Sequence, residues 1–179
     1  MNYLRLVNKN NPMEKCDVPF YLKEIDHKYN IGKNNRLDKK VKFWFETMAK
    51  AALKDDIVLK NISAYRSYEY QEKLYETYKE NNLENLDMSS AKAGYSEHQT
   101  GFALDINMDN INFFDTLEYK WLSKNAQRYG FVLRYPKGKE NITGYKFEPW
   151  HFRFVGKKHA KNIYNDNLTL EEYLENTKS

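Results

Sequence analysis

The stretch SEHQTGFALDINM (residues 96–108) passes from a polar turn into a mostly apolar run. Its second part, GFALDINM (101–108), has the composition and length of a β-strand. Gly101 stands at the junction, where a residue without a Cβ lets the chain turn tightly. His98 and Asp105 are seven positions apart, one before the turn and one in the strand, so their side chains can converge on one point.

The sequence around this stretch alternates between helical and strand patterns. Asp38 and Ser67 precede helical segments as capping residues, and Thr169 opens a capping box with Glu172. Helices are expected over residues 39–54, 68–81, 112–129 and 156–165 and after Thr169, and further strands over 56–66, 131–136 and 145–155. Loops are expected over 82–97 and 137–144, and an extended arm with one short strand at 3–7 over residues 1–36.

The order of these elements mixes strands and helices without strict β-α-β alternation. It predicts an α+β fold in one domain (1–179), a small, mostly antiparallel sheet flanked by helices, with residues 1–36 packing on it as an arm. Spacings of three and four residues predict the buried helix faces. These are Val41, Trp44, Phe45, Met48 and Ala52 in the first helix, Gln71, Leu74, Tyr75 and Tyr78 in the second, and Leu117, Trp121, Leu122 and Tyr129 in the third.

Composition excludes several classes of protein. With 41% hydrophobic residues and a net charge of +4, the chain is neither disordered nor basic enough to indicate a nucleic-acid binder. Cys16 is the only cysteine, so an intrachain disulfide is impossible and any metal must be held by His, Asp or Glu. No apolar run has transmembrane length, and the first residues do not resemble a signal peptide. We expect a cytoplasmic protein, or an extracytoplasmic one if a leader or anchor precedes this sequence.

The stretch EPWH (148–151) places a carboxylate three residues before a histidine. Metal-dependent hydrolysis uses such a pair, because the histidine binds the metal and the carboxylate takes a proton from water. In a regular strand residues three apart face opposite ways, but Pro149 interrupts the ladder, so both side chains can face one cleft. In the plainer interpretation Glu148 is an exposed strand carboxylate and Trp150 belongs to the core.

A third stretch, AYRS (64–67), puts Arg66 where a strand turns into a helix. A guanidinium at that point can hold a developing oxyanion or a substrate carboxylate, although most arginines form surface ion pairs. Gln71 lies on the inward helix face, where its amide needs a partner. That partner is either nearby backbone or substrate.

Together the motifs YRSxxxQ, SxHxxGxAxD and ExWH resemble the zinc D-Ala-D-Ala carboxypeptidases of the VanY and VanXY type. These enzymes belong to the wider group that shares the lysostaphin and hedgehog zinc fold. The likeness runs from LVNKNNP (6–12) to TLEEY (169–173), which is nearly the whole chain.

The resemblance implies a zinc ion in a cleft on the sheet, with Glu148 as catalytic base and Arg66 stabilising the tetrahedral intermediate. The implied zinc ligands are His98, Asp105 and His151, and the implied substrate-binding residues are Ser96, Gln71 and Trp150. His27 and His159 match no motif position, and we expect them to be surface or packing residues.

The resemblance also implies a D,D-carboxypeptidase that removes the terminal D-Ala from D-Ala-D-Ala-ending peptidoglycan precursors, with D,D-dipeptidase action as a second activity. A dipeptidase must accept a free ammonium group, yet Ser63, not an acid, stands two residues before Tyr65. This favours the carboxypeptidase, whereas the expected cytoplasmic location favours action on the free dipeptide or on a precursor before export, so the balance between the two activities stays open. Two alternatives stay open: an L,D-carboxypeptidase acting on tetrapeptide stems, and a non-catalytic, zinc-stabilised binding module. A mere binder needs neither Glu148 nor Arg66.

Overall fold

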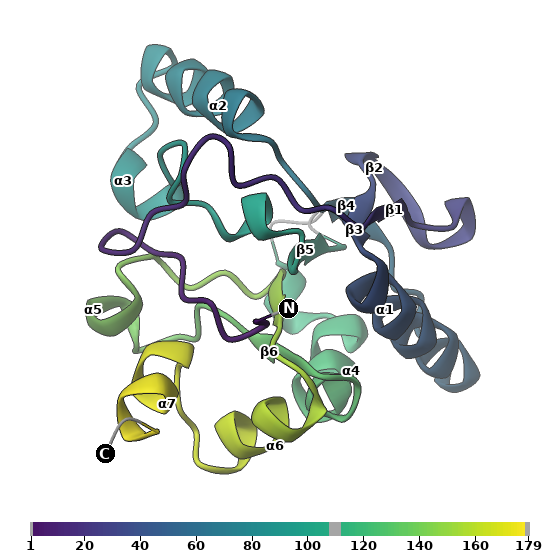
Figure 1. Cartoon of the computed structure of the whole chain (residues 1–179). Helices are drawn as coiled ribbons and strands as arrows, with labels where there is room; N and C mark the ends of the chain where they lie inside the picture. The colour runs from purple at the N-terminus through teal and green to yellow at the C-terminus, as the bar shows by residue number, and fades with distance from the viewer. Residues whose placement is uncertain (1, 108–111, 178–179) are drawn as a thin grey trace.

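A mixed sheet with strand order β2-β4-β5-β7-β6 organises the computed structural model, which describes residues 2–107 and 112–177 (Figure 1). Only β2 and β4 run parallel, and the pairs β4–β5, β5–β7 and β7–β6 are antiparallel. Strands β1 and β3 form a separate antiparallel pair. The strands are β1 (Leu22–Glu24), β2 (Asn30–Asn34), β3 (Arg36–Asp38), β4 (Asn61–Ser63), β5 (Ala103–Ile106), β6 (Phe131–Leu133) and β7 (His151–Phe154). The α+β prediction is confirmed.

Helices lie on both sides of this sheet. Figure 1 shows α1 and α4 on one side of β5 and α2 and α3 on the other. The helices are α1 (Lys39–Ala52), α2 (Tyr68–Glu80), α3 (Leu86–Ser89), α4 (Leu117–Asn125), α5 (Glu140–Thr143), α6 (Lys157–Asn165) and α7 (Leu170–Asn176). Short 3-10 helices are η1 (His27–Tyr29), η2 (Leu53–Asp55), η3 (Glu97–Thr100), η4 (Phe113–Asp115) and η5 (Ala126–Tyr129). No helix of the described ranges is both long and apolar enough to cross a membrane.

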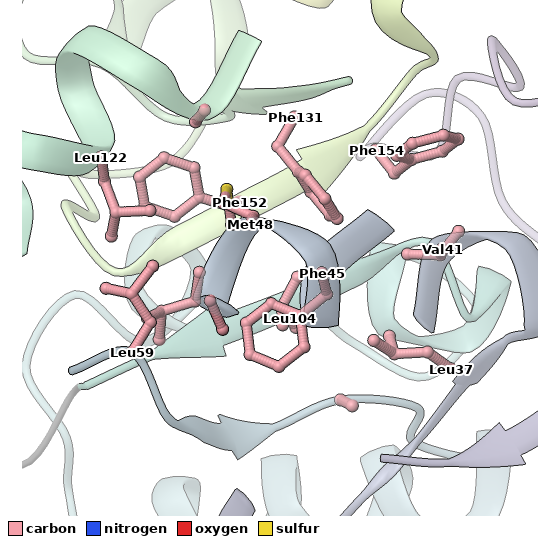
Figure 2. Close-up of a cluster of buried hydrophobic side chains, with 14 of the residues drawn as sticks. Leu37, Val41, Phe45, Met48, Leu59, Leu104, Leu122, Phe131, Phe152 and Phe154 are labelled. Carbon is pink, nitrogen blue, oxygen red and sulfur yellow. The ribbon is translucent and has the colours of Figure 1, made fainter. Parts of the chain in front are cut away.

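One face of β5 and β7 carries the hydrophobic core. Leu104 of β5 lies opposite Phe152 of β7, and both are buried with Phe154 and Phe131 of the neighbouring positions. Figure 2 shows the α1 side chains gathered against these residues, with Leu122 of α4 beside them. Because successive side chains of a strand point to opposite faces, the residues between them must face away from this core.

The opposite face of the same two strands is polar. Asp105 lies directly opposite His151, and Ala103 lies opposite Arg153. All four are buried, so this face is covered as well. The register that packs Leu104 against Phe152 therefore also pairs Asp105 with His151.

The N-terminal arm differs from its prediction. Residues 3–7 form no strand, whereas β1, β2 and β3 all lie within residues 22–38. The carbonyl oxygens of Tyr3 and Arg5 accept hydrogen bonds from the buried Arg153 guanidinium at 3.0 and 2.7 Å, so part of this backbone is satisfied by a side chain instead of a strand. In Figure 1 this purple segment runs across the front of the molecule.

The helix expected over 112–129 is wrong as a single element. The Thr116 hydroxyl accepts a hydrogen bond from the Tyr119 N–H and so starts α4 afresh after the short η4 turn. Leu117, the first residue of α4, is consequently 68% exposed, while Leu122 is buried as expected. The chain ends the following η5 turn at Gly130, which has a φ of 91°.

Most of the other predicted strands and helices are shorter in the structure than the sequence indicates. Strand β4 covers only residues 61–63 of the expected 56–66 segment, and β7 covers only residues 151–154 of the expected 145–155 segment. The expected loops 82–97 and 137–144 contain the short helices α3 and α5, and the first also contains the start of η3. The predicted caps are confirmed: Asp38 and Ser67 accept backbone hydrogen bonds at the starts of α1 and α2, and Thr169 and Glu172 form the capping box of α7.

Two phenylalanines of α1 give a matched test of this core. Phe45 is fully buried and Phe43 is 59% exposed. Phe45→Ala should lower the free energy of unfolding by about 3–5 kcal/mol, because it removes a buried ring and leaves a cavity. Phe43→Ala should change it by less than about 1 kcal/mol. Urea unfolding of both variants measures the difference, and equal losses would contradict the burial of Phe45 in the core.

Candidate metal centre and active site

The paired strands β5 and β7 bring the first two candidate ligands together. His151 Nδ1 lies 3.3 Å from Asp105 Oδ1, and both side chains are almost fully buried. Directly opposite residues of an antiparallel pair have neighbouring Cβ atoms, so this approach follows from the strand register.

His98 reaches the same point from η3, the turn before β5. The Ser96 hydroxyl caps this turn by accepting a hydrogen bond from the His98 N–H at 3.4 Å. His98 Nδ1 lies 2.7 Å from the Ala64 carbonyl oxygen, which fixes the ring with Nε2 toward Asp105 Oδ2 at 3.4 Å. Gly101 ends the turn with a φ of 70°, and a Cβ there would come within 2.9 Å of Leu22. The predicted tight turn is thus present.

These three side chains fit a metal ion. One donor atom from each lies within 4.8 Å of the others, and all three residues are buried. His98 Nε2 and Asp105 Oδ1 have no hydrogen-bond partner among the described residues, although both atoms are buried. Their lone pairs are therefore available to coordinate a metal ion. In tetrahedral zinc sites with bonds of about 2.0–2.1 Å, neighbouring donors stand about 3.3–3.4 Å apart. Each histidine stands at this spacing from one oxygen of Asp105, but not from the same one: His98 Nε2 is 3.4 Å from Oδ2 and His151 Nδ1 is 3.3 Å from Oδ1.

Electrostatics keep the donors in different protonation states. Burial lowers the pKa of His98 to about 4, so its imidazole is neutral as a ligand must be. Burial alone would raise the pKa of Asp105, but His98 and His151 outweigh it and hold the carboxyl ionised. Burial would lower the pKa of His151, yet Asp105 and Glu97 raise it to about 9. A metal ion bound at His151 Nδ1 would therefore have to displace a proton from that nitrogen.

Glu148 reaches the centre because residues 148–151 form a turn. The His151 N–H donates to the Glu148 carbonyl oxygen at 3.1 Å, with Pro149 second in the turn, so the strand expected from residue 145 begins only at His151. Glu148 Oε2 lies 3.4 Å from His151 Nδ1. Burial raises the pKa of Glu148 to about 7, which suits a group that exchanges protons near neutral pH.

Arg66 and Gln71 lie together at the side of the centre. Arg66 Nη2 is 3.6 Å from Asp105 Oδ2, and its Nη1 donates to Gln71 Oε1 at 3.1 Å. The Gln71 amide nitrogen in turn donates to the Ala91 carbonyl oxygen at 2.7 Å. Both the oxygen and the nitrogen of the Gln71 amide are thus hydrogen-bonded, so Arg66 and the Ala91 carbonyl are the partners that this buried amide needs. Arg66 is not a surface residue, since its side chain is only 15% exposed.

A cavity of about 460 Å³ opens over the centre. Ser96 and Trp150 both line it, and Trp150 also packs against the main hydrophobic cluster, so the two interpretations of this residue hold together. Other lining residues are Lys33 of β2, Leu74 and Tyr78 of α2, and Tyr135 and Tyr145. The apolar face of α2 is half-buried because it forms a wall of this cavity and only Gln71 is fully covered.

Sequence reasoning left Glu97 without a role, yet it is the acid beneath the centre. Its side chain is fully buried, and its Oε2 lies 3.6 Å from His151 Nε2. Position 97 gave no signal of its own, because its partners Arg134 and Arg153 are far along the chain. His27 and His159 do not line the cavity; His27 is fully exposed and His159 contacts Tyr173.

An α+β fold with a buried His-Asp-His group, a carboxylate beside it and a cavity above it defines a metallopeptidase-like site. Residues 34–157 match the VanY D-alanyl-D-alanine carboxypeptidase family. The Bacillus subtilis protein YodJ is 40% identical over 99% of this chain, which spans 68% of YodJ.

Two solved structures are similar along nearly the whole chain. The LD-carboxypeptidase LdcB has a TM-score of 0.89 and 38% identity, over 97% of this chain and 86% of LdcB. A mutant of the vancomycin-resistance D,D-pentapeptidase VanY in complex with Zn(II) has a TM-score of 0.83 and 34% identity, over 97% and 99% of the two chains. This chain belongs to the VanY D-alanyl-D-alanine carboxypeptidase family and is a peptidase.

Zinc binding at this centre is expected to raise the free energy of unfolding. Zinc at about a thousandfold above its dissociation constant should raise the free energy of unfolding by about 4 kcal/mol, since it binds only the folded centre. His151→Ala should lose the bound zinc and this gain. His159→Ala, a matched histidine outside the cavity, should keep both. Thermal unfolding and zinc content of the three proteins test this, and equal zinc content in His151→Ala and the parent would exclude His151 as a ligand.

Proposed function

We propose that this protein is a zinc-dependent D,D-carboxypeptidase that removes the terminal D-Ala from peptidoglycan precursor peptides ending in D-Ala-D-Ala. The observation that carries the proposal is the position of Glu148, 3.4 Å from His151 Nδ1 at the edge of the buried His-Asp-His group. A site that only stores metal has no need of a proton acceptor at that place. Membership of the VanY family and the zinc complex of a VanY structure support the proposal.

In this proposal His98, Asp105 and His151 hold zinc. Bound zinc supplies Lewis acidity, which lowers the pKa of a water to about 7 and polarises the substrate carbonyl. Glu148 accepts a proton from the attacking water as the new C–O bond forms. It then delivers the proton to the D-Ala nitrogen as the C–N bond breaks, which releases a neutral amine.

Arg66 stabilises the oxyanion that develops on the scissile carbonyl. Its guanidinium lies beside Asp105 and is held by Gln71, so it requires little reorganisation during the reaction. Arg66 Nε has no hydrogen-bond partner among the described residues, which leaves a donor for substrate. Ser96 and Trp150 line the same cavity and contact the substrate, with Ser96 near its terminal carboxylate.

The charges of the cavity favour a carboxypeptidase over a dipeptidase. Among the described lining residues the carboxylates are Glu97, Asp105 and Glu148, and all three belong to the metal centre. No acid is left there to pair with the free ammonium of a dipeptide, and Ser63 lines the cavity at the position considered for one.

A second candidate is L,D-carboxypeptidase action on tetrapeptide stems. The similarity to LdcB, with a TM-score of 0.89 against 0.83 for VanY, favours this alternative. The proposed catalytic residues and their roles are the same for both activities, so the difference lies only in the peptide accepted.

Glu148→Gln should retain zinc but lose about 10²–10⁴-fold in kcat, because the amide cannot accept the proton. The control is Glu80→Gln, which changes an exposed glutamate of α2 and should keep full activity. Zinc content and D-Ala release are measured on the same preparations. A near wild-type rate in zinc-loaded Glu148→Gln would remove Glu148 from the role of base.

Substrate choice is tested by D-Ala release from three peptides: D-Ala-D-Ala, a pentapeptide ending in D-Ala-D-Ala and a tetrapeptide ending in D-Ala. We expect release from the pentapeptide, slower release from the dipeptide, and loss of both in the presence of chelator. Preferred cleavage of the tetrapeptide would establish the L,D alternative. No release from any of them would contradict the enzymatic proposal.

A further inference from the structure

Glu97 stands at the centre of a buried charge cluster that the proposed chemistry does not use. Its side chain and those of Arg134 and Arg153 have no exposed surface, and Glu171 of α7 is 9% exposed. Placing these charges away from water is costly, and such a cluster persists only where its groups are closely paired. The cluster lies directly beneath the candidate metal centre.

The two oxygens of Glu97 face different partners. Oε1 accepts hydrogen bonds from Arg134 Nε at 2.7 Å and from Arg153 Nη1 at 2.6 Å. Oε2 points the other way, 3.6 Å from His151 Nε2. Neither Glu97 Oε2 nor His151 Nε2 has a hydrogen-bond partner among the described residues, although both atoms are buried.

We propose that Glu97 is a positioning residue for the metal centre: its Oε2 accepts the Nε2 proton of His151 and so presents His151 Nδ1 to the metal. This inference rests on the proposed zinc site. A histidine ligand commonly donates its second ring N–H to a carboxylate, which fixes the tautomer and strengthens the ligand. The two nitrogens of the His151 ring are placed as this role requires. Nδ1 faces Asp105 and the candidate metal position, and Nε2 faces Glu97.

The arginines fix Glu97 in this position. Arg134 is held from below by Glu171, whose two oxygens accept its Nη1 and Nη2 at 2.8 and 2.6 Å. Arg153 is held by the carbonyl oxygens of Tyr3 and Arg5. Glu97 therefore cannot turn away from His151 without breaking hydrogen bonds in a cluster that includes backbone of the N-terminal arm and a side chain of α7.

The chemistry requires a carboxylate at this position. A carboxylate offers acceptor oxygens on both sides, one for the two arginines and one for the His151 proton, whereas an amide offers only one oxygen. In Glu97→Gln an NH₂ group must face either the arginines or His151 Nε2. Facing His151, it favours the tautomer whose proton is on Nδ1, which competes with the metal.

The test compares Glu97→Gln with Glu171→Gln. Both remove one charge from the same buried cluster, but the hydrogen bonds of Glu171 go to Arg134 and Asn8 and not to His151. Zinc affinity is measured by competition with a chelator on folded protein, and the Co(II)-substituted proteins report the ligand field. We expect Glu97→Gln to bind zinc about 10–100-fold more weakly, with a changed Co(II) spectrum, and Glu171→Gln to stay within about threefold of wild type.

Equal affinities in Glu97→Gln and wild type, or equal losses in both variants, would overturn the positioning role. If wild type itself binds no zinc, the proposed function fails instead. A second measurement needs no variant and so does not depend on Glu97→Gln folding. In zinc-loaded wild type the nitrogen-15 NMR signals of His151 should show a proton on Nε2 and none on Nδ1, and the reverse assignment would contradict the inference.

Discussion

The antiparallel register of β5 and β7 is the constraint on which the rest of the structure depends. It sets Leu104 against Phe152 on the core face and Asp105 against His151 on the polar face. A slip of one residue would reverse both faces at once, because the side-chain period of a strand is two. Core packing thus holds the candidate ligands in place, and the free energy of burying Leu104 and Phe152 also keeps the two donors adjacent.

The polar face carries several buried charged side chains. Asp105, Glu97 and Glu148 lie close to Arg66 and the two arginines beneath, so each carboxylate has a cation or imidazole near it. Replacing one partner would leave the other unpaired in a medium of low polarity. This arrangement is costly for folding and useful for chemistry, since dipoles and charges that are already fixed do not have to reorient during a reaction.

The sequence predicted the fold class, the caps and the residues that meet at the centre, because these follow from local patterns and short motifs. The predicted strands were too long at residues 56–60 and 145–150. Apolar and aromatic composition favours strands there, but the backbone of these residues forms none. The turn at Pro149 was foreseen only as an irregularity. Glu97 could not be interpreted, because a glutamate beside a histidine has no meaning until Arg134 and Arg153 are seen to meet it.

The charge cluster beneath the centre also determines when the site can finish folding during synthesis. Arg153 is bonded to the carbonyl oxygen of Tyr3 across 150 residues, and Glu171 to Asn8 across 163. Contacts of such large sequence separation form late, since long loops must close first. A nascent chain that still lacks α7 lacks Glu171, the second carboxylate that pairs with Arg134 beside Glu97. Residues up to and including α7 must therefore leave the ribosome before the hydrogen-bonded cluster beneath the centre can be completed.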